Sequence, residues 1–302
     1  MKRDFLTLMD LSSDEVVLLL KRAIELKSGK DAQKCPLIGK SIGLVFEKAS
    51  TRTRISLEVG IYQLGAQAIY MSPKDTQIGR GETVHDTAKV LSRYLDAIVI
   101  RTYSHNTLME LASYSSIPVI NGLSDLHHPC QILSDLMTIL EKKGRLKDIK
   151  LTYIGDGNNV ANSLIEAASL MGLNLVMACP KGYEPDHEIL KKAKASSNSH
   201  IAVVTDSKEA ADKADVLYTD VWVSMGQEKE EAKKKRKFKD YQLNSKLLSY
   251  AKKDAIVLHC MPAHRGEEIT DEVIDGPQSV VFDQAENRLH TQKALLEFLL
   301  TR

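Results

Sequence analysis

Hydrophobic residues in the first half of this chain fall into two patterns that alternate along the sequence. Short unbroken apolar runs predict buried strands, and longer stretches with apolar residues every three or four positions predict amphipathic helices. A regular alternation of the two is typical of a parallel sheet with helices on its faces. The strands predicted in this way cover residues 41–46, 67–71, 97–100 and 119–121.

The same alternation restarts after a predicted helix that ends at Gly144, with a new apolar run from Leu151. Helical spacing over residues 283–300 predicts one more amphipathic helix near the C-terminus. We therefore expect an α/β protein with two doubly wound parallel-sheet domains and a boundary near residues 145–150. The predicted strands of the second half cover residues 151–154, 173–178, 201–204, 216–219 and 255–258.

Composition narrows the range of functions. Of 302 residues, 43% are hydrophobic and 27% are charged, and the net charge is +1, so nothing indicates a nucleic acid or an acidic membrane as the main partner. The first 13 residues lack a secretory signal pattern, and no apolar run is long enough to span a bilayer. The four cysteines are widely spaced and form no C-x-x-C pair. This spacing predicts a reduced cytoplasmic protein without a structural zinc or a disulfide framework.

Hydroxyl and guanidinium groups cluster in the turn between the first predicted strand and the helix that follows it. Ser50, Thr51 and Thr53 supply hydroxyl donors, while Arg52 and Arg54 supply planar cations that suit phosphate. A helix N-terminus adds unpaired backbone N–H groups and a partial positive charge. The turn therefore predicts a phosphate-sized anion site, although an ordinary helix cap with two solvated arginines fits the same residues.

Further polar residues of the first half also follow predicted strands. Arg101 ends the strand 97–100, and the carboxyl ends of strands are where open α/β sheets bind ligands. His128 and Gln131 stand at the start of the next predicted helix, three positions apart, and therefore share one face. Taken alone, His128 followed by Pro129 favours a histidine that only caps the helix, because so short a motif is weak.

Gly155 and Gly157 follow a predicted strand and precede a helix, as in a dinucleotide-binding turn. The third glycine of that fingerprint would stand where this chain has Val160. No acidic residue ends the next strand, where Cys179 and Pro180 stand instead. These departures disfavour a dinucleotide site and an NAD-dependent dehydrogenase, and we expect no cofactor.

Two strand ends of the second half carry candidate chemistry. Asp220 directly follows the strand 216–219, and Cys260 comes shortly after the strand 255–258. Asp220 also fits a helix cap, and Cys260 also fits a small buried hydrophobic residue. Residues 228–239 are dense in charges of both signs, which predicts a solvated, mobile helix or loop, with a lid as the alternative.

Four motifs together make the chain resemble the aspartate/ornithine carbamoyltransferase family, and within it the ornithine enzymes. They occur in the family's order, and the resemblance covers essentially the whole chain. Met261 replaces the leucine usual in the last motif, a substitution that conserves volume and hydrophobicity. The motifs are the carbamoyl-phosphate signature at Ser50–Arg54, the second signature at His128–Gln131, the ornithine loop at Asp220–Gly226 and the His-Cys-Leu-Pro element at His259–Pro262.

The resemblance implies a carbamoyl-phosphate-binding domain over residues 1–147, joined by the C-terminal helix 285–302, and an ornithine-binding domain over residues 148–284. It implies transfer of the carbamoyl group of carbamoyl phosphate to the δ-amino group of L-ornithine, in a homotrimer or a higher assembly of trimers. The implied carbamoyl-phosphate ligands are Ser50, Thr51, Arg52, Thr53, Gln77, Arg101, His128, Pro129, Cys130, Gln131, Cys260, Met261 and Arg288. The implied ornithine ligands are Asn159, Asp220, Ser224 and Met225, and the implied catalytic residues are Arg101, His128, Asp220 and Cys260.

Carbamoyl transfer requires a bound phosphate leaving group, a polarised carbonyl and an uncharged amine. The turn at Ser50 suits the first requirement. Arg101 and His128 suit the second, provided that His128 donates a hydrogen bond. An alkyl amine has a pKa of about 10.4, so presenting it uncharged at pH 7 costs roughly 4–5 kcal/mol. We hypothesise that Asp220 fixes the α-amino group of the acceptor and that Cys260 orients the attacking amine.

Other acceptors and other classes of protein stay open at this stage. Putrescine lacks the carboxylate that Asn159 would bind, a derivatised ornithine is a further option, and aspartate has a second carboxylate for which the loop after Asp220 offers no basic partner. A non-catalytic sensor of phosphate metabolites on the same fold is disfavoured, because it would not need Arg101, His128 and Cys260.

Overall fold

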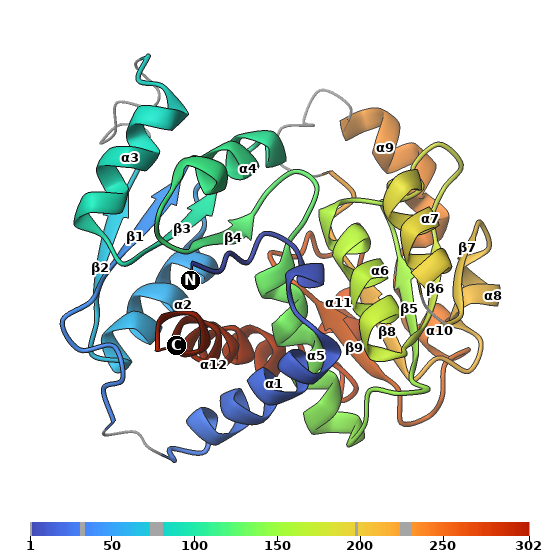
Figure 1. Ribbon diagram of the computed structural model, residues 1–302. Helices are drawn as coiled ribbons and strands as arrows, with labels where there is room; N and C mark the ends of the chain where they lie inside the picture. Colours follow the sequence, from blue (N-terminus) through green and yellow to red (C-terminus); the bar gives the residue numbers. More distant parts are fainter. Residues whose placement is uncertain (1, 31–33, 73–80, 197–198, 224–230, 302) are drawn as a thin grey trace. The chain divides into compact units, whose positions relative to one another are not determined.

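The computed structural model describes residues 2–30, 34–72, 81–196, 199–223 and 231–301 of the chain (Figure 1). The chain forms two compact units, one made of residues 1–137 with 286–302 and the other of residues 138–285. Each unit contains one parallel sheet with helices, which confirms the predicted α/β class. Among the described residues, no helix is both long enough and apolar enough to cross a membrane.

The sheet of the first unit has four parallel strands in the order β2-β1-β3-β4. All four predicted strands of the first half are present. β1 and β3 are buried along almost their whole length, because helices cover both faces of a parallel sheet. The strands are β1 (Ser41–Phe46), β2 (Gln67–Met71), β3 (Ala97–Arg101) and β4 (Val119–Leu123).

The helices of the first unit begin at polar capping residues. The side chains of Ser12, Ser50, Thr83 and Ser104 each accept a hydrogen bond from a backbone N–H in the first turn of the helix that follows. The helices are α1 (Ser13–Lys27), α2 (Thr51–Gln63), α3 (Val84–Tyr94), α4 (His105–Tyr114) and the first part of α5 (Pro129–Lys143), with a 3₁₀ turn η1 (Leu8–Asp10) before α1.

The C-terminal helix α12 (Val281–Leu300) belongs to the first unit from residue 286 onward. Arg22 of α1 donates two hydrogen bonds of 3.0 Å to the Glu297 carboxylate of α12. Ser56 of α2 donates a hydrogen bond of 2.7 Å to Gln292 of α12. The predicted return of the C-terminal helix to the N-terminal part of the chain is therefore confirmed, and Figure 1 shows α12 running beside α2.

The sheet of the second unit has five parallel strands in the order β7-β6-β5-β8-β9. All five predicted strands are present. They are β5 (Lys150–Ile154), β6 (Asn174–Ala178), β7 (Ile201–Val204), β8 (Val216–Thr219) and β9 (Ile256–His259). The helices are α6 (Asn159–Met171), α7 (His187–Ser196), α8 (Ser207–Ala211), α9 (Glu231–Phe238), α10 (Ser245–Leu248) and α11 (Asp271–Ile274), with a 3₁₀ turn η4 (Lys239–Tyr241) after α9.

Packing within the chain explains the two glycines after β5. Gly155 has a φ of +146°, a backbone conformation that favours glycine. A Cβ atom added to Gly157 would lie 2.2 Å from the backbone nitrogen of Pro185 and 2.3 Å from the carbonyl carbon of Glu184. In a dinucleotide-binding turn the second glycine lets the backbone approach the cofactor pyrophosphate, but here the chain's own backbone fills that space. The glycine pair therefore serves folding, in agreement with the expectation from the missing third glycine.

Candidate active site

The strand order of the first unit creates a topological switch point between β1 and β3. From β1 the chain continues to β2 on one side, and from β3 it continues to β4 on the other. Open α/β sheets bind their ligands at the carboxyl ends of strands at such a point. The turn from Ser50 to Thr53 follows β1, and Arg101 is the last residue of β3, so the fold brings these predicted site residues to one sheet edge.

The start of α2 combines the two roles that the sequence left open. Ser50 is the N-cap, and its Oγ accepts a hydrogen bond of 3.2 Å from the backbone N–H of Thr53. A capping hydroxyl keeps its own hydrogen, so Ser50 can still donate to an anion. Thr51 is exposed and Arg52 is half-buried at the same helix end. The cap and the predicted anion site are therefore compatible.

Arg54 does not belong with the residues aimed at this sheet edge. Its Nε donates a hydrogen bond of 2.9 Å to Glu58, one turn along α2, and its guanidinium lies 3.6 Å from the centroid of the Tyr70 ring. Residues four apart on a helix are neighbours, so the Arg54 side chain lies along the helix surface, where it pairs with Glu58. In this structure Arg54 therefore pairs with Glu58 on the surface of α2, as the alternative of a solvated arginine expects.

Buried basic side chains gather in the first unit. Arg101, Arg288 and His128 are 7%, 3% and 4% exposed, respectively. Arg288, in the part of α12 that returns to this unit, donates hydrogen bonds of 2.8 Å to Gln131 Oε1 and 2.5 Å to Thr53 Oγ1. Both acceptors are neutral, so these two bonds orient the guanidinium without neutralising its charge.

His128 is neutral at pH 7 in this environment. Burial, together with the neighbouring guanidinium groups of Arg288 and Arg101, holds the pKa of His128 well below its usual range. A neutral imidazole has one N–H donor and one acceptor nitrogen. His128 therefore carries one ring N–H donor, the kind of group that polarises a carbonyl.

The neighbours of His128 at the start of α5 are buried as well. Cys130 donates a hydrogen bond from Sγ to the carbonyl oxygen of Asn121 at 3.3 Å, and burial raises the pKa of this thiol to about 12. Cys130 is therefore a protonated thiol that points into the fold, and only its backbone suits a ligand. Pro129 is buried beside it, and Gln131 Nε2 donates to Asp135 at 2.8 Å.

Lys48 was not among the predicted site residues, although it lies in the turn between β1 and α2. Its side chain is 6% exposed, and its Nζ lies 4.1 Å from the centroid of the Tyr103 ring. A buried lysine stacked on an aromatic ring adds positive charge at this sheet edge. Its position in the same turn as the predicted anion site was the available sequence signal.

The second unit has its own switch point, between β5 and β8. From β5 the chain continues to β6 on one side, and from β8 it continues to β9 on the other. Asn158 and Asn159 follow β5, Asp220 follows β8, and Cys260 follows β9. The structure therefore brings predicted residues from three separate strand ends to a single sheet edge.

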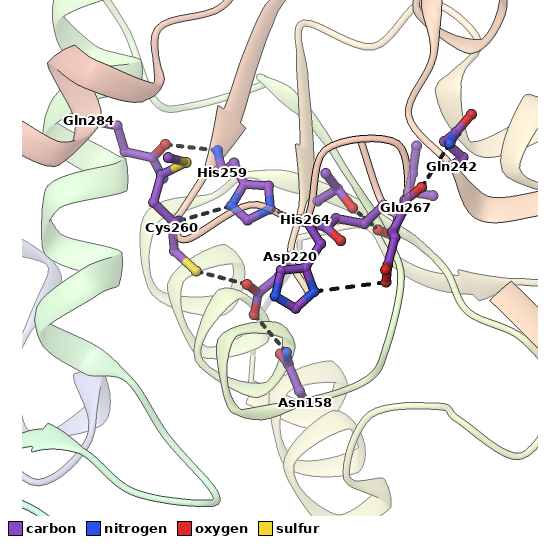
Figure 2. Close-up of polar contacts among 12 residues, drawn as sticks. Asn158, Asp220, Gln242, His259, Cys260, His264, Glu267 and Gln284 are labelled. Carbon is purple, nitrogen blue, oxygen red and sulfur yellow. Dashed lines mark hydrogen bonds and ion pairs between the residues drawn. The ribbon is translucent and has the colours of Figure 1, made fainter. Parts of the chain in front are cut away.

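Asp220 is the centre of a hydrogen-bonded cluster at this edge (Figure 2). Its Oδ1 accepts from Cys260 Sγ at 2.9 Å, and its Oδ2 accepts from Asn158 Nδ2 at 2.7 Å. Asp220 is 5% exposed. Each carboxylate oxygen can accept a further hydrogen bond, so the cluster presents an oriented acceptor for a cationic group.

Asn158 belongs to this cluster, although the sequence analysis predicted only its neighbour Asn159. Asn158 caps α6: its Oδ1 accepts from the backbone N–H groups of Val160 and Ala161 at 3.0 and 3.2 Å. With its oxygen used by the helix, its amide nitrogen faces Asp220. An asparagine directly before a predicted helix was the signal that could have identified it.

A buried ion pair lies next to this cluster. Lys234 of α9 and Asp156, after β5, are 3% and 6% exposed, and their charged atoms are 2.5 Å apart. Phe238 of the same helix is fully buried. Most residues of α9 are exposed, in agreement with the predicted solvated helix, but Lys234 and Phe238 are buried and hold this helix against the unit. The charge of the Asp156 carboxylate is therefore balanced by the Lys234 ammonium group.

Among the described residues, two groups could offer ligands to a metal ion: Asp220 with His259 and Cys260, and His264 with Glu267 and Glu268. In the first group both ring nitrogens of His259 already form hydrogen bonds. In the second, Glu267 already pairs with Lys235 at 2.6 Å. Metal binding at either group would displace an existing bond.

Three predicted site residues, Gln77, Ser224 and Met225, lie outside the described residues. Met261 is half-buried and has a φ of +58°, which is uncommon for a residue with a side chain.

Two parallel sheets, each with polar residues at its switch point, characterise a two-domain α/β protein. Comparison with known proteins agrees. The carbamoyl-P binding domain of the aspartate/ornithine carbamoyltransferase family matches residues 3–141, and the Asp/Orn binding domain of that family matches residues 147–299. The chain therefore belongs to the aspartate/ornithine carbamoyltransferase family, and it is a transferase.

Individual relatives are similar over their full length. The ornithine carbamoyltransferase of Syntrophus aciditrophicus (strain SB) is 55% identical, and the match covers 99% of this chain and 100% of that protein. The solved structure of ornithine carbamoyltransferase from Pyrococcus furiosus is 49% identical, with a TM-score of 0.95 and coverage of 99% and 97%. That of the anabolic enzyme from Campylobacter jejuni is 43% identical, with a TM-score of 0.94 and coverage of 99% of both chains.

Proposed function

We propose that this protein transfers the carbamoyl group of carbamoyl phosphate to the δ-amino group of L-ornithine, giving L-citrulline and phosphate in arginine metabolism. The observation that carries the proposal is the hydrogen-bonded cluster around Asp220 at the second switch point. Asp220, oriented by Asn158 and Cys260, suits the ammonium group of an amino acid. The relatives named above are ornithine carbamoyltransferases, which supports the same acceptor.

The basic residues of the first unit suit carbamoyl phosphate. Phosphate would bind at the start of α2, where hydroxyls, backbone N–H groups and the helix dipole converge. Arg101 would bridge the phosphate and the carbamoyl oxygen, and neutral His128 would donate to that oxygen as negative charge develops on it. The complete set proposed to contact carbamoyl phosphate is Ser50, Thr51, Arg52, Thr53, Gln77, Arg101, His128, Pro129, Cys130, Gln131, Cys260, Met261 and Arg288.

The cluster around Asp220 in the second unit suits ornithine. Asp220 would bind the α-amino group, Asn159 the carboxylate, and Ser224 and Met225 the remainder of the acceptor. Cys260 would orient the δ-amine. In the transfer step the δ-nitrogen forms a bond to the carbonyl carbon, the bond from that carbon to the phosphate oxygen breaks, and the proton lost by the amine passes to the leaving phosphate. The phosphate leaves with the electron pair of the broken bond.

This assignment divides the work between domains. We place carbamoyl-phosphate binding in residues 1–147 with helix 285–302, and ornithine binding in residues 148–284. The family regions that match, 3–141 and 147–299, carry the corresponding descriptions. The widely spaced cysteines are typical of a reducing compartment, which supports a cytoplasmic location.

We also propose that the protein assembles as a homotrimer, alone or in a higher assembly of trimers. Helix α2 carries an apolar face of Ile55, Val59 and Tyr62, which are 53%, 38% and 80% exposed. Their spacing of four and three residues places them on one side of the helix, and exposed apolar surface of this kind marks interfaces. Sedimentation equilibrium should give a trimer mass for the wild type and smaller species for Tyr62→Asp, while Tyr250→Asp in the other unit should leave the mass unchanged.

The function is tested by measuring phosphate release from carbamoyl phosphate with ornithine, acetylornithine, putrescine, lysine and aspartate. We expect strong preference for ornithine, with citrulline formed in equal amount. Preference for another amine would overturn the assignment of Asn159, Asp220 and Ser224. If folded protein still binds carbamoyl phosphate but turns over no amine, the interpretation as a non-catalytic sensor would replace that as an enzyme.

A further inference from the structure

His259 is the last residue of β9, directly before Cys260 (Figure 2). Its side chain and that of Glu268 are 0% exposed, and His259 Nε2 lies 3.1 Å from Glu268 Oε1. Neither residue has a role in the reaction described above. A histidine and a glutamate that are completely buried together require a structural or functional reason, because burying polar groups is costly unless they are hydrogen-bonded.

The hydrogen bonds determine which nitrogen of His259 carries the proton. The backbone N–H of Met261 donates to His259 Nδ1 at 2.9 Å, so Nδ1 must be an acceptor. The proton is then on Nε2, which donates to Glu268. Glu268 Oε1 also accepts from the backbone N–H of His264 at 2.5 Å. Two buried side chains therefore bind two backbone amides of the segment from Cys260 to His264.

The backbone of His259 is hydrogen-bonded as well. Its backbone N–H donates to Gln284 Oε1 at 2.9 Å, and Gln284 Nε2 donates to the Tyr218 hydroxyl at 3.3 Å. The backbone of His259 is therefore anchored to Gln284, and the segment after β9 is bound to the imidazole through the Met261 N–H. Met261 in particular needs such support, since its φ of +58° persists only where neighbouring contacts impose it.

We propose that His259 and Glu268 are a positioning pair that holds the segment Cys260–His264, so that Cys260 stays in hydrogen-bond contact with Asp220 and the Met261 backbone keeps its unusual conformation. The inference rests on the proposed function, because it assigns the pair to the orientation of the amine acceptor. His259 touches no reacting atom in this scheme and acts through Met261 and Cys260. Displacement of reacting groups by about 1 Å can cost about 100-fold in rate, which sets the scale of the effect.

Two substitutions of His259 separate its two hydrogen bonds. In His259→Asn the amide oxygen takes the place of Nδ1 and can still accept from the Met261 N–H. In His259→Gln the amide reaches the place of Nε2, and the acceptor for Met261 is lost. We expect kcat with ornithine to fall about 10- to 100-fold in His259→Gln. We expect His259→Asn to recover at least about tenfold of that loss, because it keeps the bond to Met261.

Glu268 provides an independent pair of variants. Glu268→Gln keeps an acceptor oxygen for the His264 N–H and for His259 Nε2, whereas Glu268→Met removes it. We expect Glu268→Met to lower kcat by about tenfold or more and Glu268→Gln to stay within about threefold of the wild type. The matched controls are His187→Asn and His187→Gln on α7, where the side chain is 83% exposed, and we expect both to match the wild type.

The measurements are kcat and KM for ornithine, the dissociation constant of inorganic phosphate, and circular dichroism of each variant. Partial unfolding alone would reduce the concentration of active enzyme and would leave the KM of both substrates unchanged. A positioning role predicts a lower kcat and a higher KM for ornithine, with phosphate binding unchanged.

Equal kcat in folded His259→Gln and wild type would overturn the inference, as would equal losses in His259→Gln and His259→Asn. A wild type that does not use ornithine would instead overturn the proposed function, so the two failures are distinguishable.

Discussion

The two units of this protein place polar residues at equivalent points of their sheets but give them opposite charge. In the first, Arg101 and Arg288 are buried near the switch point between β1 and β3, and Arg288 is oriented by neutral oxygens. In the second, Asp156 and Asp220 follow β5 and β8, and Asp156 is neutralised by Lys234. The comparison shows that one topology can prepare sites for an anion and for a cation, because the strand order fixes only where the site lies.

The largest effect is expected from breaking the charge balance of the second unit. Lys234→Met leaves the Asp156 carboxylate buried without its cation, which should lower the free energy of unfolding by about 3–5 kcal/mol. Urea unfolding followed by fluorescence of Trp222, the only tryptophan, measures the change in this unit. The double variant Asp156→Asn with Lys234→Met should recover more than half of the loss. A cost below about 1 kcal/mol for the single variant would show that the pair is unimportant.

Removing a cation from the first unit should act on the reaction. Arg101→Gln should lower kcat/KM for carbamoyl phosphate about 100- to 1,000-fold, or about 2.7–4 kcal/mol, since a donor to the developing oxyanion is lost. Steady-state phosphate release measures it. Arg93→Gln, on the exposed surface of α3, is the matched control and should leave the rate unchanged. A loss of less than about threefold in Arg101→Gln would remove this residue from the proposed mechanism.

Neutralising Asp220 in the second unit should weaken the use of ornithine as the acceptor. Asp220→Asn keeps the size of the side chain but loses the charge-assisted bond to an ammonium group. We expect kcat/KM for ornithine to fall about 10- to 100-fold, corresponding to about 1.4–2.7 kcal/mol. Inorganic phosphate should bind with unchanged affinity by calorimetry. Weaker phosphate binding in this variant would contradict the division of labour between the two units.

The smallest effect is a dependence of stability on pH that comes from the first unit. Because the pKa of His128 is lowered in the folded state, the unfolded chain binds a proton first as the pH falls below about 6.5. Stability is therefore fully present above that pH and declines below it, by up to about 1.4 kcal/mol per pH unit for one group. His128→Asn should reduce this slope in denaturant unfolding. Equal slopes in wild type and His128→Asn would contradict the neutral histidine.

Sequence periodicity was sufficient for the nine strands in the described part of the chain, because each strand of a covered parallel sheet is a short apolar run bounded by turn residues. It was less informative for α8, α10 and α11, which span only four or five residues. The exposed, charged character of α9 was predicted, but the burial of Lys234 within it was not. Its sequence is mostly charged, and only the tertiary partner Asp156 explains why Lys234 is buried.

The candidate site divides in the same way. Sequence alone determined which residues stand at strand ends and helix starts, since those positions follow from local pattern and capping preference. Only the tertiary structure decided which of them meet. Arg288 reaches Thr53 across 235 residues of sequence, Cys260 reaches Asp220 across 40, and His259 is buried against Glu268. The reason is physical. Local periodicity specifies an element and its buried face, whereas a hydrogen bond between distant side chains depends on which strands and helices lie next to one another in the folded chain.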